Sequence, residues 1–186
     1  MKKIIVIFLF LIICFGCSNS VDVKYPYTIQ SKNVDMSMYD GVTSTEHMFK
    51  SVTVQELFNT IDKKSSGVFY LGRDNCSCCQ TCIQYLNEAA MDLGVTVYYI
   101  NAYDEEMPVA SDSETYNKLF EYLYDILDTV DGEKQLQTPT IFSVINGEIV
   151  DHLICLGDFA WDTPPTKLQT LRLVNKYKSI LEPFSK

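Results

Sequence analysis

The sequence places four cysteines within seven consecutive positions, in the stretch DNCSCCQTC at residues 74–82. Structural disulfides usually join segments that lie far apart in the sequence, so a cluster this dense makes a poor cross-linking framework. Three uses remain open at this point: a redox pair, a thiolate metal site, or two reactive thiols beside two that only pack in a core. Each use requires a different surrounding structure, so the residues that flank the cluster help to distinguish the three uses.

The cluster lies where a predicted strand meets a predicted helix. The apolar run VFYL at residues 68–71 has strong strand propensity. After the cluster, apolar residues recur with the spacing of one helix face until Gly94, a typical helix-ending residue. These positions are Cys79, Ile83, Leu86, Ala90 and Leu93. We therefore expect Cys76 at the N-terminus of a helix.

That position predicts the roles of two cysteines. Unpaired backbone N–H groups and the helix dipole stabilise an anion at a helix N-terminus, and the thiolate is the reactive form of cysteine. Cys76 is therefore the predicted nucleophile. Cys79 lies one helical turn further on, where its thiol can resolve a mixed disulfide formed on Cys76.

Strands and helices alternate in the rest of the chain. Further strands are expected at residues 48–52, 95–100, 141–145 and 148–156, the last two joined by the hairpin turn Asn146–Gly147. Helices are expected after capping boxes at Thr53–Glu56 and Ser111–Glu114, and after Thr163–Pro164. The apolar positions of the last helix are Leu168, Leu171, Val174 and Leu181. The opening β-α-β-α-β order predicts an α/β fold around a central sheet.

Two separated motifs in this order resemble those of the thioredoxin superfamily. One is VFYLGRDNCSCC at residues 68–79, and the other is TPTIFSVINGEI at residues 138–149. The resemblance implies a mixed sheet flanked by helices, with one extra helix between the third strand and the cis-proline strand. It also implies a Cys76–Cys79 redox motif facing a cis peptide bond before Pro139, with Thr138 binding an extended substrate. The pattern FYLGRxxCxxC is similar to the bacteriocin transport accessory proteins, small thioredoxin-like proteins of Gram-positive bacteria.

Two positions depart from the thioredoxin pattern. Thioredoxin carries a buried acid six residues before its first active cysteine, and this chain has Tyr70 there. The proline in the middle of the helix after the motif is replaced by Gln84. Tyr70 favours an alternative of a different class, a thioredoxin-like accessory module that binds a partner with little redox turnover.

The N-terminus resembles a bacterial lipoprotein signal. Lys2 and Lys3 precede an apolar run at residues 4–15, and Gly16–Cys17 closes it before polar residues follow. Twelve apolar residues suit a secretory signal better than a membrane span. We expect a signal peptide at residues 1–16 and a lipidated Cys17; a plain signal peptide or an uncleaved anchor is the alternative. The folded part is then expected at the cell membrane, outside the cytoplasm.

The remaining regions carry less specific signals. Residues 17–46 read as a polar tether or extension, alternatively as a structured extension that packs through its tyrosines, and residues 47–186 as the thioredoxin-like domain. The net charge of −9 argues against nucleic-acid binding.

The other thiols have simpler expected roles. Cys78 is expected to be exposed, either as a competing resolving thiol or as an incidental residue. Cys82 borders the apolar face and is expected to pack in the core, with a redox role as the alternative. Cys155 reads as a small core residue of the last strand.

A metal site is the weaker interpretation of the cluster. Zinc usually takes four ligands from two separated pairs, and the sequence has no second CxxC motif away from this cluster. Its only histidines are His47 and His152, which read as packing or surface residues. The sequence therefore predicts a thiol–disulfide oxidoreductase without cofactor or metal, acting on thiols or disulfides of exported proteins or peptides together with a redox partner protein.

Overall fold

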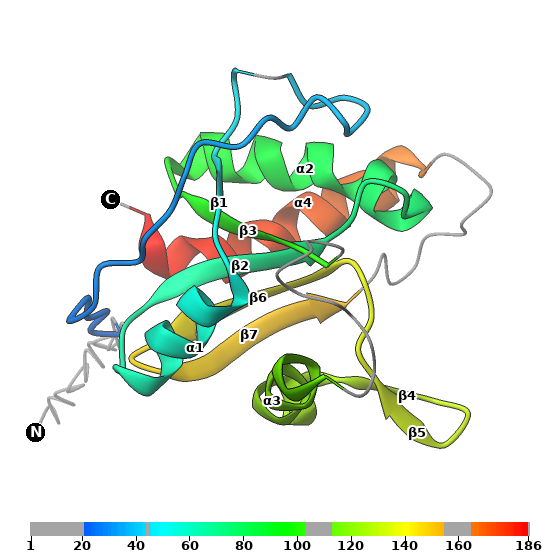
Figure 1. The fold of residues 1–186 in the computed structure, drawn as a ribbon. Helices are drawn as coiled ribbons and strands as arrows, with labels where there is room; N and C mark the ends of the chain where they lie inside the picture. Colours follow the sequence, from blue (N-terminus) through cyan, green and yellow to red (C-terminus); the bar gives the residue numbers. More distant parts are fainter. Residues whose placement is uncertain (1–20, 44, 103–112, 155–164, 186) are drawn as a thin grey trace, which may run out of the picture.

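The computed structural model describes residues 21–43, 45–102, 113–154 and 165–185. Its centre is a five-stranded sheet in the order β1–β3–β2–β6–β7 (Figure 1). The strands span Phe49–Ser51 (β1), Gly67–Gly72 (β2), Val97–Asn101 (β3), Thr140–Ile145 (β6) and Glu148–Ile154 (β7). Strands β1, β3 and β2 run parallel, whereas β6 and β7 are each antiparallel to the preceding strand in that order.

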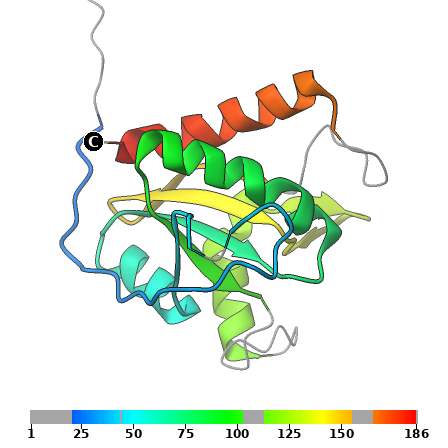
Figure 2. The same ribbon diagram turned by 90° about the horizontal axis from the view of Figure 1, so that it is seen from above.

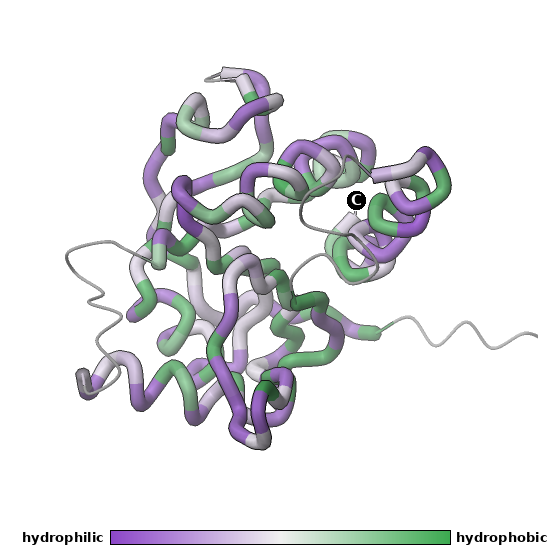
Figure 3. Tube along the Cα trace, turned by 90° about the vertical axis from the view of Figure 1, so that its right-hand side faces the viewer, coloured by the Kyte–Doolittle hydropathy of each residue, from purple (hydrophilic) through white to green (hydrophobic). Residues whose placement is uncertain are grey.

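Helices cover both faces of this sheet. Two lie side by side on one face, namely α2 (Ser77–Leu93) and α4 (Lys167–Leu181) (Figures 1 and 2). The other face carries α1 (Val54–Asp62) and α3 (Glu114–Leu123). Along the tube of Figure 3, helices alternate between hydrophilic and hydrophobic residues, the pattern of helices with one buried face. The sheet therefore separates two hydrophobic cores.

Strand β2 supplies both cores because successive side chains of a strand point to opposite faces. Val68 and Tyr70 belong to the core under α2 and α4, whereas Phe69 and Leu71 belong to the core under α1 and α3. A mixed sheet with this order, between two helical layers, is the thioredoxin fold. The predicted fold class is thus confirmed, including the extra helix α3 between β3 and β6.

Short elements fill the connections, and the sequence did not indicate them. A hairpin joins β4 (Asp128–Val130) to β5 (Glu133–Gln135), and single 3₁₀ turns follow α3 at Tyr124–Ile126 and α4 at Glu182–Phe184. The hairpin is a separate two-stranded sheet, mostly exposed, so no apolar alternation marks it in the sequence.

The predicted capping box of α1 does not form. Thr53 precedes the helix but makes no side-chain capping hydrogen bond. The Glu56 carboxylate instead accepts hydrogen bonds from the Tyr27 hydroxyl (2.7 Å) and the Gln30 backbone N–H (2.8 Å). Glu56 therefore holds the N-terminal extension rather than the start of its own helix.

The starts of α3 and α4 also differ from prediction. The N-cap of α3 is Ser113, whose Oγ accepts from the backbone N–H of Tyr116 (3.0 Å), so the box predicted from Ser111 is wrong. Helix α4 begins at Lys167 and not at Pro164. Its N-cap Thr166 forms a complete capping box with Gln169, which satisfies two donors at once. Residues 111 and 163–164 themselves lie outside the described residues.

The buried face of α4 is shorter than predicted. Val174 and Leu181 are buried as expected, but Leu168 and Leu171 are 58% and 51% exposed. The N-terminal turns of α4 diverge from α2, as Figure 2 shows, so their apolar side chains do not reach the core. The periodic pattern marked the right helix face but could not show where the contact with the sheet begins.

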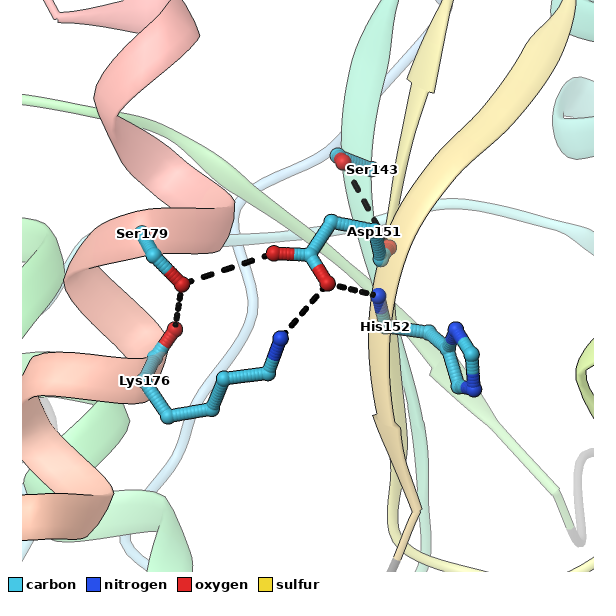
Figure 4. A network of polar contacts seen from close by, with 5 residues as sticks. All are labelled: Ser143, Asp151, His152, Lys176 and Ser179. Carbon is cyan, nitrogen blue, oxygen red and sulfur yellow. Dashed lines mark hydrogen bonds and ion pairs between the residues drawn. The ribbon is translucent and has the colours of Figure 1, made fainter.

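A polar network ties α4 to the edge strand β7. Lys176 Nζ lies 2.6 Å from Asp151 Oδ1, and the Ser179 hydroxyl donates to Asp151 Oδ2 over 3.4 Å (Figure 4). The same carboxylate accepts from the backbone N–H of His152 at 2.8 Å. Because the ion pair is only half-buried, we expect its contribution to stability to be modest.

The extension packs against the domain wherever it is described. Lys32 pairs with Ser51 at the outer edge of β1, and Met36, Tyr39 and Val42 are buried in the core of α2 and α4. From residue 21 onward the chain is therefore a structured extension, and core packing begins before residue 47. Among the described residues, no helix is long and apolar enough to cross a membrane.

Candidate active site

Cys76 caps helix α2 with its sulfur. Its backbone is extended, with φ −98° and ψ 116°, and its Sγ accepts a hydrogen bond from the backbone N–H of Cys79 over 3.3 Å. The sulfur takes the place usually held by a serine or aspartate oxygen, among the unpaired donors of the first turn. The position predicted for Cys76 from the sequence is confirmed, and at 7% exposure the residue is mostly shielded.

The second motif meets Cys76 in space. The Thr138–Pro139 peptide bond is cis, as the resemblance implied, and it directly precedes β6. In its thiol form Cys76 donates to the Thr138 carbonyl oxygen at 3.4 Å. The antiparallel pairing of β6 with β2 brings these two segments to the same end of the sheet. Cys76, Thr138 and Pro139 therefore form one site, although 62 residues separate the first two.

The surroundings of Cys76 favour its thiolate. They lower its pKa from 9.0 to about 5, chiefly through a hydrogen bond from the Cys79 thiol. The backbone N–H of Cys79, a side-chain hydrogen bond with Thr138 and the positive charge of Arg73 act in the same direction, while partial burial opposes them. Arg73 is a contributor that the sequence analysis missed. The sequence feature that could have identified Arg73 is its basic side chain three positions before the nucleophile.

Cys79 has the opposite character. The hydrogen bond to Cys76 and burial of the thiol both raise the pKa of Cys79 above its ordinary range. A proton shared between the two sulfurs thus resides on Cys79, and the negative charge resides on Cys76. This asymmetry is what a nucleophile and a shielded second thiol need.

Cys78 is buried, so the prediction that it is exposed is wrong. Cys78 and Cys82 share the core under α2 and α4 with the buried Tyr177, and both lie within electrostatic range of its hydroxyl. Cys82 is buried as predicted, with the Tyr70 hydroxyl 3.9 Å from its sulfur. A phenol from each side therefore faces Cys82. Cys155 lies outside the described residues.

Tyr70 lies fully buried where thioredoxin carries its acid. Burial raises the pKa of the Tyr70 hydroxyl well above 10.0, so this residue stays a neutral phenol. Its ring stacks on Tyr99 with a centroid separation of 6.1 Å. Tyr70 therefore supplies packing and a hydroxyl, but no carboxylate base for Cys79.

The described residues contain no group of three or more histidine, cysteine or acidic side chains arranged to hold a metal ion. Of the two histidines, His47 is a packing residue: its Nε2 contacts the Val34 carbonyl oxygen at 3.1 Å and its Nδ1 accepts from the Phe49 backbone N–H. His152 lies on β7. The cluster is thus arranged around sulfur–sulfur and sulfur–hydroxyl contacts.

No protein-family model matches the chain, and no curated protein matches it significantly. Similar solved structures include a thioredoxin from Trypanosoma brucei brucei, with 14% identity and a TM-score of 0.43 over 76% of this chain and 99% of that one. Thioredoxin O2 from Arabidopsis thaliana has 16% identity and a TM-score of 0.40 over 75% and 96% of the two chains. These likenesses concern the fold alone, and the fold assignment rests on strand order.

Proposed function

We propose that this protein is a thiol–disulfide oxidoreductase in which Cys76 attacks and Cys79 resolves. The observation that carries the proposal is the pair of sulfurs at the start of α2, with the charge on Cys76 and the proton on Cys79. The cis peptide bond before Pro139 and the Thr138 carbonyl oxygen beside Cys76 support it.

The reaction follows from this geometry. The Cys76 thiolate attacks one sulfur of a substrate disulfide, so a mixed disulfide forms and the other substrate sulfur leaves as a thiolate. Cys79 then gives its proton to the substrate thiolate released in the first step and attacks the Cys76 sulfur, which releases the second substrate thiolate. The substrate gains two electrons, and the motif ends as a Cys76–Cys79 disulfide. The reverse sequence oxidises a substrate dithiol, and a redox partner protein sets the direction.

The substrate proposed is an extended segment of an exported protein or peptide. Thr138 supports this, because its carbonyl oxygen lies 3.4 Å from the attacking sulfur at a part-buried position. A segment laid along this backbone places its own sulfur against Cys76. The chemistry uses no cofactor, because the two thiols carry the electrons.

We also propose that the protein is exported and held at the membrane by a lipid on Cys17. The apolar run that ends at Gly16–Cys17 supports this, and the FYLGR–CxxC motif supports a place near the bacteriocin transport accessory proteins. Mass spectrometry of the purified native protein tests the anchor. A diacylglyceryl-modified Cys17 is expected, and an unmodified N-terminus at another residue would refute it.

A binding module with little turnover is the second candidate. The observation that favours it is Tyr70, which offers no carboxylate to take the Cys79 proton. Trapping and turnover together separate the candidates, since a binding module holds its partner without a covalent intermediate.

The test is a set of single cysteine variants expressed in the native host. Cys79→Ser should accumulate a mixed disulfide between Cys76 and a substrate, and Cys76→Ser should accumulate none. Cys82→Ser is the matched control and should behave as the wild type. If the Cys79→Ser adduct decays, Cys78→Ser/Cys79→Ser tests whether Cys78 resolves it. The oxidoreductase proposal would be refuted if no variant formed an adduct and the wild type showed no disulfide turnover.

A further inference from the structure

The N-terminal extension contains a loop that lies on the redox helix. Residues 36–43, here called the strap, turn twice: Tyr39 N donates to the Met36 carbonyl oxygen (3.0 Å) and Val42 N donates to the Tyr39 carbonyl oxygen (3.3 Å). The side chains of Met36, Tyr39 and Val42 enter the core that contains the four cysteines of the cluster. Figure 1 shows this part of the extension over α2.

Gln80, the residue after Cys79, fastens the strap to the first turn of α2. Its Oε1 accepts from the Asp40 backbone N–H (2.8 Å), and its Nε2 donates to the Met38 carbonyl oxygen (2.9 Å). The same Nε2 donates to the Asp74 carbonyl oxygen (2.5 Å), in the loop that leads to Cys76. One amide therefore joins the strap, the helix and the approach to the nucleophile.

Two further amides continue this contact along α2. A Cβ on Gly41, which has a φ of +83°, would lie 2.9 Å from Gln84 Oε1, so the strap approaches the second turn as closely as glycine allows. Asn87 accepts from the Met48 backbone N–H (3.0 Å) and donates to the Glu46 carbonyl oxygen. Gln84, which replaces the expected proline, thus forms part of the docking face for the extension.

Tyr39 brings the strap to the back of the redox pair. Its hydroxyl lies 3.1 Å from that of Tyr99, and the two rings meet edge to face. Tyr99 stacks on Tyr70, whose hydroxyl faces Cys82. Burial is the main cause that raises the pKa of Tyr39, followed by its contact with Tyr99, and an electrostatic interaction with Cys79 acts in the same direction. Tyr39 and Cys79 therefore lie within electrostatic range.

We propose that the strap is a positioning element of the redox site, which closes one flank of α2 so that Cys79 reacts only through Cys76. This inference rests on the redox function proposed above. Gln80 is the positioning residue that fastens the strap, and Tyr39 is the side chain that fills the space behind the helix. If the strap detaches, the disulfide chemistry remains possible, but small reagents can also reach Cys79 directly.

The experiment measures alkylation of Cys79 by iodoacetamide in the Cys76→Ser background, with peptide mapping to assign each thiol. Adding Gln80→Ala removes two hydrogen bonds to the strap and one to the loop before Cys76. Cys79 should then react about tenfold faster, because a buried thiol reacts through local opening. Gln55→Ala is the matched control. Gln55 is also a helical glutamine, but it bonds only to Asn59 of its own helix α1, and its loss should leave the rate unchanged.

A second measurement uses the chain with all its cysteines. If the strap positions Cys79, then Gln80→Ala weakens the hydrogen bond from Cys79 and moves the pH midpoint of Cys76 alkylation upward. A purely structural role for Gln80 would leave that midpoint in place. Tyr39→Phe, which keeps the packing and loses the Tyr99 contact, should give a smaller shift in the same direction.

The outcomes separate this inference from the function on which it rests. Equal Cys79 rates in the Gln80→Ala and Gln55→Ala chains overturn the strap, as does an equal acceleration of Cys78, Cys79 and Cys82, which signals general loosening. Wild-type disulfide turnover is measured alongside. Turnover without a strap effect refutes the strap alone, whereas a strap effect with neither turnover nor a trapped adduct refutes the oxidoreductase proposal.

Discussion

The two faces of the central sheet are built from different chemical groups. The core under α2 and α4 contains all the described cysteines and four buried tyrosines: Tyr39, Tyr70, Tyr99 and Tyr177. The core under α1 and α3 is formed by aliphatic and phenylalanine side chains, and its buried part, as far as the structure describes it, contains no cysteine or tyrosine. Among the described residues, the buried thiols and buried phenols thus lie on one face. We call the face under α2 and α4 the chemical face and the face under α1 and α3 the packing face.

Removal of the nucleophile on the chemical face should change activity more than any other single substitution. Cys76→Ser should lower disulfide turnover on the order of 10³-fold or more, because a serine hydroxyl supplies no thiolate at neutral pH. A turbidity assay of protein disulfide reduction measures this. Circular dichroism of the same sample should show an unchanged fold. Substantial residual turnover would mean that another residue is the nucleophile, and the chemistry could then no longer be assigned to the chemical face.

The packing face should respond in stability alone. Phe142 is fully buried and stacks on Phe69 with ring centroids 5.8 Å apart. Phe142→Ala should cost about 3–5 kcal/mol of unfolding free energy, measured by denaturant titration, because a large cavity remains. Phe142→Leu is the milder control. A changed pH midpoint of Cys76 alkylation in folded Phe142→Ala would show that the two faces are coupled.

The alkylation of Cys76 should depend on pH in a way that an ordinary cysteine does not. Its alkylation rate should rise through a midpoint near pH 5 and stay flat to pH 8, since its pKa is lowered from 9.0 to about 5. A cysteine with the ordinary pKa of 9.0 would be only about 1% thiolate at pH 7. A midpoint above pH 8 would remove the basis for assigning Cys76 as the nucleophile.

The same pKa shift affects the stability of the reduced protein. Between pH 5 and 9 the unfolded state binds the proton that folded Cys76 has released, so this residue makes stability rise with pH. Its contribution is complete above the unfolded pKa and is lost as pH falls through about 5. Cys76→Ser should flatten the difference between denaturation midpoints at pH 5 and pH 8.

The smallest expected effect concerns Cys82. Cys82→Ser should cost about 1 kcal/mol, because a hydroxyl fits the site and meets the Tyr70 hydroxyl but loses apolar contact. Turnover and trapping should match the wild type within twofold. Thermal unfolding measures the cost. A large loss of turnover would extend the chemistry to a third sulfur.

Local sequence patterns predicted the position of the cysteines better than they predicted the segments that pack around them. Cys76 lies at a helix N-terminus because an apolar strand and a periodic helix flank it, and both patterns are readable over a dozen residues. The Asn146–Gly147 turn fixed the β6–β7 hairpin in the same way. Each of these features depends on neighbours in sequence.

Features that depend on distant partners were not predictable. Cys78 is buried in a core that it shares with Tyr177 of α4, about 90 residues later in the chain. Glu56 leaves the predicted capping box because Tyr27 and Gln30 of the extension offer it two donors. The extension looked like a tether because only three apolar side chains of the strap reach the core, without a regular period.

The pairing of Lys32 with Ser51 has a consequence for behaviour in concentrated solution. An open sheet edge is a template for a strand from another molecule. The extension occupies the outer side of β1 at this pair, while at the opposite edge β7 carries a bulge and the charged side chain of Asp151. Both edge strands of the sheet are therefore protected against pairing with a strand of another molecule. A chain lacking residues 21–35 would regain one open border and with it a tendency to aggregate through β1.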